Sequence, residues 1–158
     1  MAKYFSLIYS IIDVMHKTFY ASVFLYHPPS QQILLQKNSS ISTMSSPWLL
    51  FGGVYLEKEE PEALLKNIIF KLLNIKIKVV HLVYSYFNEN TDKFQYVVYS
   101  KLRKFQNFSS KNGLTFAWFS FKDALKLQIT EQTKHDILVV QRVIDAATRK
   151  RLDQHTFQ

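Results

Sequence analysis

The sequence predicts a single α/β domain. Its 158 residues suit one domain, and a domain of this length buries roughly 70% of the surface that its unfolded chain exposes. Runs of β-branched and aromatic residues alternate with two segments whose apolar residues recur every three to four positions, and these are the patterns of strands and amphipathic helices. The composition, 47% hydrophobic and 15% aromatic with 3 glycines, indicates a packed globule. The absence of cysteine excludes disulfides and cysteine-rich zinc sites.

The strand-like runs are arranged as two hairpins and two further strands. A turn containing Pro28 and Pro29 separates the first pair, and the polar turn 88–93 separates the second pair. A short strand ends at the glycine pair Gly52 and Gly53, and a last strand contains Trp118. The expected strands are 19–26, 32–36, 47–51, 78–87, 94–102 and 114–121.

Two helices are expected, at 61–73 and 134–152, with a short helical turn at 122–127. Pro61 suits the first turn of a helix, and the acids around it favour the positive end of the helix dipole. Both helices carry one apolar stripe. The stripe residues are Leu64, Leu65, Ile68, Ile69, Leu72 and Leu73 in the first helix and Ile137, Leu138, Val140, Ile144 and Ala147 in the second.

The chain is expected to form one domain over 18–152, with an N-terminal extension at 1–17 that packs on it and a C-terminal tail at 153–158. The apolar run 4–15 is interrupted by Ser6, Ser10 and Asp13, and it is shorter than the roughly 20 residues that cross a bilayer. We therefore expect no transmembrane segment, and a soluble, cytoplasmic protein is the favoured interpretation.

The formal charge of +8 predicts attraction to anions, which include nucleotides, RNA and acidic proteins. Two basic clusters are candidates for such contacts. One lies near Phe105 and Phe108, and the interleaving of cations with rings is a composition that can bind nucleic acid. The favoured interpretation of this segment is a charged loop whose phenylalanines return to the core. The other ends the last helix, where basic residues also stabilise the helix dipole. The candidate residues are Lys101, Arg103, Lys104, Arg149, Lys150 and Arg151.

The segment 48–75 resembles the Nudix box, whose family pattern is G-x5-E-x7-R-E-U-x-E-E-x-G-U with U aliphatic. Gly53 matches the first glycine, Glu59 the first glutamate, and Ile69 and Ile75 the aliphatic positions. The order of elements over about 18–148 is also similar to that of the Nudix (MutT-like) hydrolases. The resemblance implies a Nudix-type α/β/α sandwich with a mixed β-sheet.

The departures from the family pattern affect the metal-binding helix. In the same register, Asn67 stands where the family has arginine, and Ile68 stands where it has the next glutamate. Lys71 and Leu72 replace the family's glutamate pair. Between Glu62 and the second hairpin turn the sequence contains no acid. Because Mg²⁺ requires hard oxygen ligands, this helix offers it none. By resemblance, only the Gly52 carbonyl and the Glu59 carboxylate remain as ligands.

Three functional hypotheses remain open. The first is a catalytically impaired Nudix-fold protein that binds a nucleotide-like ligand or serves as an interaction module. The second is a Mg²⁺- or Mn²⁺-dependent pyrophosphohydrolase of nucleoside diphosphate-linked substrates with relocated carboxylates. In the third, the basic surface is the functional part of the protein and binds RNA or an acidic partner. The candidate relocated acids are Glu57, Glu59, Glu60 and Glu62, or Glu89 and Asp92, and the first four equally fit solvated charges at a helix start.

Overall fold

The computed structural model describes residues 18–39, 46–56 and 58–156, with side chains described as far as Leu152. The expected extension 1–17 and the candidate acid Glu57 lie outside these residues. The last helix continues to Thr156, so most of the expected tail is helical.

The core of the fold is a mixed, seven-stranded sheet whose main path runs β3-β2-β1-β6-β5. Strand β1 pairs with β6 in parallel and with β2 and β4 in antiparallel orientation. Strand β7 extends the sheet beside β2, and β5 forms a hairpin with β6. The strands are β1 Thr18–His27, β2 Gln32–Asn38, β3 Trp48–Leu49, β4 Phe51–Leu56, β5 His81–Asn88, β6 Lys93–Lys101 and β7 Leu114–Ser120.

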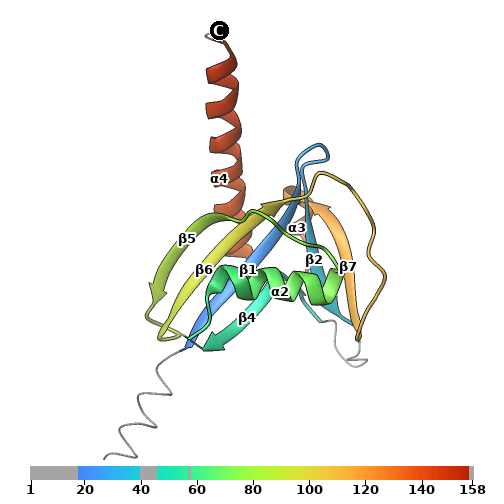
Figure 1. Ribbon diagram of the computed structural model, residues 1–158, viewed down its shortest axis with the longest axis vertical. Helices are drawn as coiled ribbons and strands as arrows, with labels where there is room; N and C mark the ends of the chain where they lie inside the picture. The colour runs from blue at the N-terminus through green and yellow to red at the C-terminus, as the bar shows by residue number, and fades with distance from the viewer. Residues whose placement is uncertain (1–17, 40–45, 57, 157–158) are drawn as a thin grey trace, which may run out of the picture.

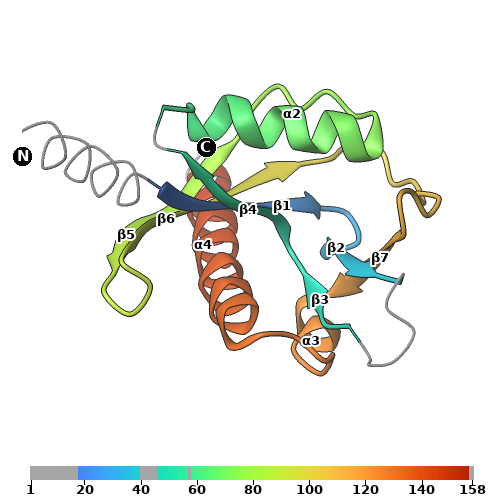
Figure 2. The ribbon, with the colours of Figure 1, turned by 90° about the horizontal axis from the view of Figure 1, so that it is seen from below.

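Helices cover both faces of this sheet. Helix α2 (Pro61–Leu73) lies across one face, and α4 (Glu131–Thr156) lies against the other and extends past the sheet (Figure 1). The view from below shows the sheet between the two helices, with the short α3 (Phe121–Ala124) beside the start of α4 (Figure 2). The structure therefore confirms the expected α/β/α sandwich with a mixed sheet.

Alternating side chains of β1 supply the cores on both faces. Val23 and Leu25 are fully buried with the residues under α2, whereas Phe24 and Tyr26 are buried with the residues under α4. This alternation is the period of a strand whose two faces are both covered. Among the described residues no helix combines the length and apolarity that crossing a bilayer requires.

Several details differ from the sequence-based expectation. The predicted strand 47–51 is divided between β3 and β4, and α4 begins at Glu131 and not at 134. The glycine pair lies inside β4, because Gly52 and Gly53 pair with β1 and the strand continues to Leu56. Strand β5 begins three residues later than predicted, since the carbonyl of Val79 accepts a hydrogen bond from the Ser100 hydroxyl at 2.8 Å instead of joining the ladder. In α4, Leu138 and Ala147 are exposed, so the buried stripe is narrower than predicted.

Candidate functional site

The glycine pair is explained by strand packing. Gly52 has φ +144°, and a Cβ there would lie 2.0 Å from the Ala21 carbonyl oxygen of the neighbouring strand. At Gly53 a Cβ would meet only the Tyr55 hydroxyl, at an ordinary 3.5 Å. The fold therefore requires glycine at the first position and tolerates a side chain at the second.

The acids that precede and open α2 behave as helix-start residues. The Glu59 backbone N–H donates to the Leu56 carbonyl at 3.1 Å, which closes the turn before the helix. Glu60 occupies the N-cap position, and its carbonyl accepts from the Leu64 N–H at 3.0 Å. The Glu62 carboxylate forms an ion pair with Lys66 one turn later, at 2.5 Å. Glu62 is thus engaged in an ordinary i, i+4 surface pair.

The positions that match the family's metal ligands belong to the core or to the solvent. Ile68 and Leu72 are half-buried and pack against the apolar cluster that contains Leu65 and Ile69. Lys71 is exposed, and its carbonyl accepts a hydrogen bond from the Lys111 ammonium at 2.8 Å.

Among the residues that the structure describes, the side chains present do not fit a divalent metal of the Nudix kind. Within the described part of the chain, no three His, Asp or Glu side chains come close enough together to hold a metal ion. Glu59, Glu60 and Glu62 therefore do not join into one ligand set, and Glu89 and Asp92 in the β5–β6 turn meet no third such side chain. The helix instead places apolar groups and a lysine where hard oxygen ligands are needed.

An aromatic hollow lies beside Glu59, at the end of the sheet where β1 and β6 begin. It has a volume of about 280 Å³ and is lined by Phe19, Glu59, Pro61, Phe94 and Tyr96. The rings of Phe19 and Tyr96 meet edge to face at 5.7 Å, and Phe94 lies 6.4 Å from Tyr96.

The Glu59 carboxylate is electrostatically coupled to this ring cluster. Tyr55 packs on Phe19 with the ring centroids 6.0 Å apart. Burial raises the pKa of the Tyr55 hydroxyl, and the nearby Glu59 carboxylate raises it further. One carboxylate and several rings therefore share this hollow, a combination that suits a planar group carrying N–H donors.

The sequence did not reveal these rings as site residues. Phe19, Phe94 and Tyr96 carry only the signal of strand residues, and the parallel pairing of β1 with β6 sets Phe19 opposite Phe94. The one available signal is that Phe94 is apolar yet adjoins a polar turn.

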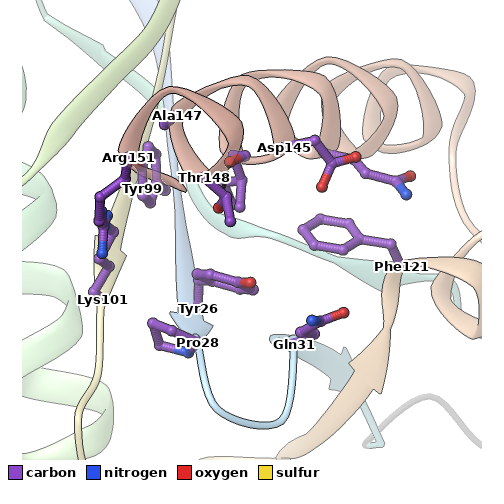
Figure 3. A pocket seen from close by; sticks show the side chains of 12 residues that line it. Tyr26, Pro28, Gln31, Tyr99, Lys101, Phe121, Asp145, Ala147, Thr148 and Arg151 are labelled. Atoms are coloured by element: carbon purple, nitrogen blue, oxygen red, sulfur yellow. Dashed lines mark hydrogen bonds between the residues drawn. The ribbon is translucent and has the colours of Figure 1, made fainter. Parts of the chain in front are cut away.

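The six basic candidates do not form one surface. Lys101 and Arg151 line a second cavity of about 260 Å³ on the α4 side of the sheet (Figure 3). Arg149 borders an adjoining depression that shares Asp145 and Thr148 with this cavity, and Lys150 is exposed on α4. The remaining two, Arg103 and Lys104, are exposed in the loop after β6.

The rings near Arg103 and Lys104 are anchored to the protein. Phe105 is partly exposed, but its ring packs 5.2 Å from that of Trp118 and 5.2 Å from that of His27. The Trp118 indole N–H donates to the Gln106 carbonyl at 2.9 Å, and Phe108 packs against the core under α2. The predicted interleaving of cations and rings is therefore largely a loop held to the core.

The sheet order and the helices on its two faces define a Nudix fold. Three solved structures share this fold. The E. coli ORF135 protein is 16% identical with a TM-score of 0.63, over 82% of this chain and 91% of that one. A C. elegans Ap4A hydrolase binary complex is 14% identical with a TM-score of 0.62, over 80% of this chain and 98% of that one. A NUDIX hydrolase from Nitrosomonas europaea is 11% identical with a TM-score of 0.58, over 80% of this chain and 89% of that one. No protein-family profile and no curated protein sequence matches the chain. At these identities the similarity establishes the fold.

Proposed function

We propose that this chain is a Nudix-fold binding protein that lacks metal-dependent hydrolysis and holds a nucleotide-like ligand in the hollow beside Glu59. The observation that carries the proposal is the packing of Ile68 and Leu72 into the core under α2. A metal-dependent Nudix site would need carboxylates at these positions. Here the same positions contribute to stability, so the helix has a structural role in place of a catalytic one.

The electrostatics of α2 support the same conclusion. Lys71 stands where the family has a glutamate, and a cation at that position repels a divalent ion. Glu59 retains its place in the loop, but among the described residues it belongs to no group of three His, Asp or Glu side chains that could hold an ion. A single exposed carboxylate holds Mg²⁺ weakly, since Mg²⁺ retains its own water shell unless several ligands or a substrate phosphate replace it.

The hollow has the chemistry to bind a base. The rings of Phe19, Phe94 and Tyr96 offer apolar faces and edges, and Glu59 accepts hydrogen bonds from amine or ring N–H groups. The fold neighbours include a protein named as an Ap4A hydrolase, which supports a nucleotide-like ligand.

The catalytic part of the proposal is tested by incubating the protein with Ap4A and about 5 mM Mg²⁺ or Mn²⁺, a concentration high enough to fill weak sites for divalent cations. We expect no release of mononucleotides above the buffer blank, measured by chromatography of the reaction products. Hydrolysis at enzymatic rates that is abolished by Glu59→Gln would overturn the proposal in favour of relocated carboxylates. Manganese located crystallographically against the 52–62 loop would have the same consequence.

The binding part is tested by calorimetry with Ap4A in the absence of metal. Phe94→Ala removes a ring that lines the hollow, and we expect at least about tenfold weaker binding because base stacking on an aromatic ring contributes about 1–3 kcal/mol. Phe70→Ala is the matched control, since Phe70 on α2 is 43% exposed against 47% for Phe94 but does not line the hollow. Equal affinities for the two variants would place the ligand elsewhere.

A further inference from the structure

The cavity on the α4 side is formed by segments that are distant in the sequence. Tyr26 comes from the end of β1, Tyr99 and Lys101 from β6, Phe121 from α3, and Arg151 from the last turns of α4. Parallel pairing places Tyr26 directly opposite Lys101, and the Leu102 N–H donates to the Tyr26 carbonyl at 2.8 Å. The floor of the cavity is therefore a rigid part of the sheet.

One end of the cavity is cationic. Lys101 places its ammonium nitrogen 5.9 Å from the centre of the Tyr99 ring. Burial raises the pKa of the Tyr99 hydroxyl, and the nearby Arg151 guanidinium opposes that rise. Both cations are thus close to the same tyrosine, and in the described part of the chain neither forms an ion pair with a carboxylate. Two unpaired cations against one wall suit a doubly charged phosphate.

The other end combines rings with an acid. The Tyr26 and Phe121 rings lie 5.9 Å apart, tilted by 40°. Burial raises the pKa of the Tyr26 hydroxyl, and the Asp145 carboxylate raises it further. Figure 3 shows Lys101 and Arg151 on one side of the cavity, Phe121 and Asp145 on the other, and Tyr26 between them.

This polarity specifies the ligand. We propose that the cavity binds a nucleoside monophosphate whose base carries an exocyclic amine, with the phosphate at Lys101 and Arg151 and the base at Tyr26 and Phe121. A carboxylate accepts hydrogen bonds, so Asp145 at this end of the cavity favours a base that offers N–H donors. Guanine meets this requirement well because its ring N–H and its amine are adjacent. The volume of about 260 Å³ suits one small ligand.

The proposal is independent of the hollow beside Glu59. The cavity lies on the opposite face of the sheet, and none of its lining residues also lines the hollow. Its test uses the full chain carrying Phe94→Ala, so that binding in the hollow is already weakened. Failure of one site then leaves the result for the other unchanged.

The experiment is calorimetric titration with guanosine monophosphate, inosine monophosphate and inorganic phosphate. Arg151→Gln and Lys101→Gln each remove a charged donor to the phosphate, and we expect each to weaken binding of guanosine monophosphate by about tenfold or more. Lys150→Gln is the matched control, because it removes the same charge from the adjacent position of α4 without lining the cavity. We expect it to change the affinity less than twofold at physiological salt, where distant surface charges are screened.

The role of the exocyclic amine is tested by comparing guanosine monophosphate with inosine monophosphate, which lacks only that amine. We expect guanosine monophosphate to bind about fivefold tighter than inosine monophosphate, and Asp145→Ala to abolish this difference. Three results would overturn the proposal: no binding of guanosine monophosphate, equal losses in the Arg151→Gln and Lys150→Gln proteins, or inorganic phosphate binding as tightly as the nucleotide.

Discussion

The two faces of the sheet differ in the kinds of residue that they bury. Under α2 the core is an apolar cluster that contains Phe51, Leu65 and Ile69, and the helix that matches the Nudix box is part of it. On the α4 side, Ser22 and Gln95 of the sheet and Asp136 of α4 are buried in addition to the apolar residues. The family motif therefore lies on the face whose buried residues are mainly apolar, whereas more of the buried polar side chains lie on the other face.

The buried polar groups under α4 are incompletely satisfied. The Ser22 hydroxyl, the Gln95 amide oxygen and one Asp136 carboxylate oxygen lack a hydrogen-bond partner among the described residues. On the α2 side the Gln36 amide oxygen also lacks one. The other Asp136 oxygen accepts hydrogen bonds from the Tyr84 hydroxyl and from the Gln132 amide, the latter at 2.8 Å. Buried polar atoms without partners cost stability, so this face is the less optimised of the two. A comparison of faces can be tested by substitutions on each.

The largest expected effect is at Gly52 in β4, where the strand packs edge to edge on the β1 backbone. Gly52→Ala drives a Cβ into the Ala21 carbonyl at a backbone conformation that L-residues rarely adopt, and we expect a loss of more than about 4 kcal/mol or a failure to fold. Gly53→Ala meets only ordinary contacts and is expected to change the free energy of unfolding by less than about 1 kcal/mol. Urea denaturation followed by circular dichroism measures both. Similar losses in the two variants would mean that strand packing does not explain Gly52.

The elements that sequence reasoning located well are those determined by local signals. Helix α2 has the bounds predicted from Pro61 and from its three-and-four periodicity. The extent of β4 was missed because glycine carries no strand signal, and only the pairing of Gly52 with Ser22 in β1 keeps the chain extended there.

The sites depended on contacts that the local sequence does not contain. Phe19 meets Phe94 through the parallel pairing of β1 with β6, across more than 70 residues. Arg151 reaches Tyr99 because α4 crosses the sheet at that strand. The topology therefore determines which cations share a cavity. The two basic clusters are recognisable in the sequence, but the fold places the members of each cluster at different sites.

On the α4 side, the buried carboxyl of Asp136 makes the stability of the fold depend on pH. Burial raises the pKa of this carboxyl to about 6 from its ordinary value of 3.8, although hydrogen bonds from Tyr84 and Gln132 and the nearby His135 oppose the rise. Because the folded state keeps its proton where the unfolded state has lost it, stability falls as the pH rises from about 4 to 6, and the loss levels off above the folded pKa. By pH 7 the loss amounts to about 3 kcal/mol.

Asp136→Asn removes the ionisation and keeps an oxygen that accepts from Tyr84 and Gln132. We therefore expect the variant to lose most of this pH dependence and to be more stable relative to the wild-type protein at pH 7.5 than at pH 4.5. The measurement is the free energy of unfolding by urea at these two pH values, and the difference between the two proteins isolates Asp136 from other titrating groups. An unchanged pH dependence would show that Asp136 ionises without penalty, in which case the face under α4 is as well satisfied as the face under α2.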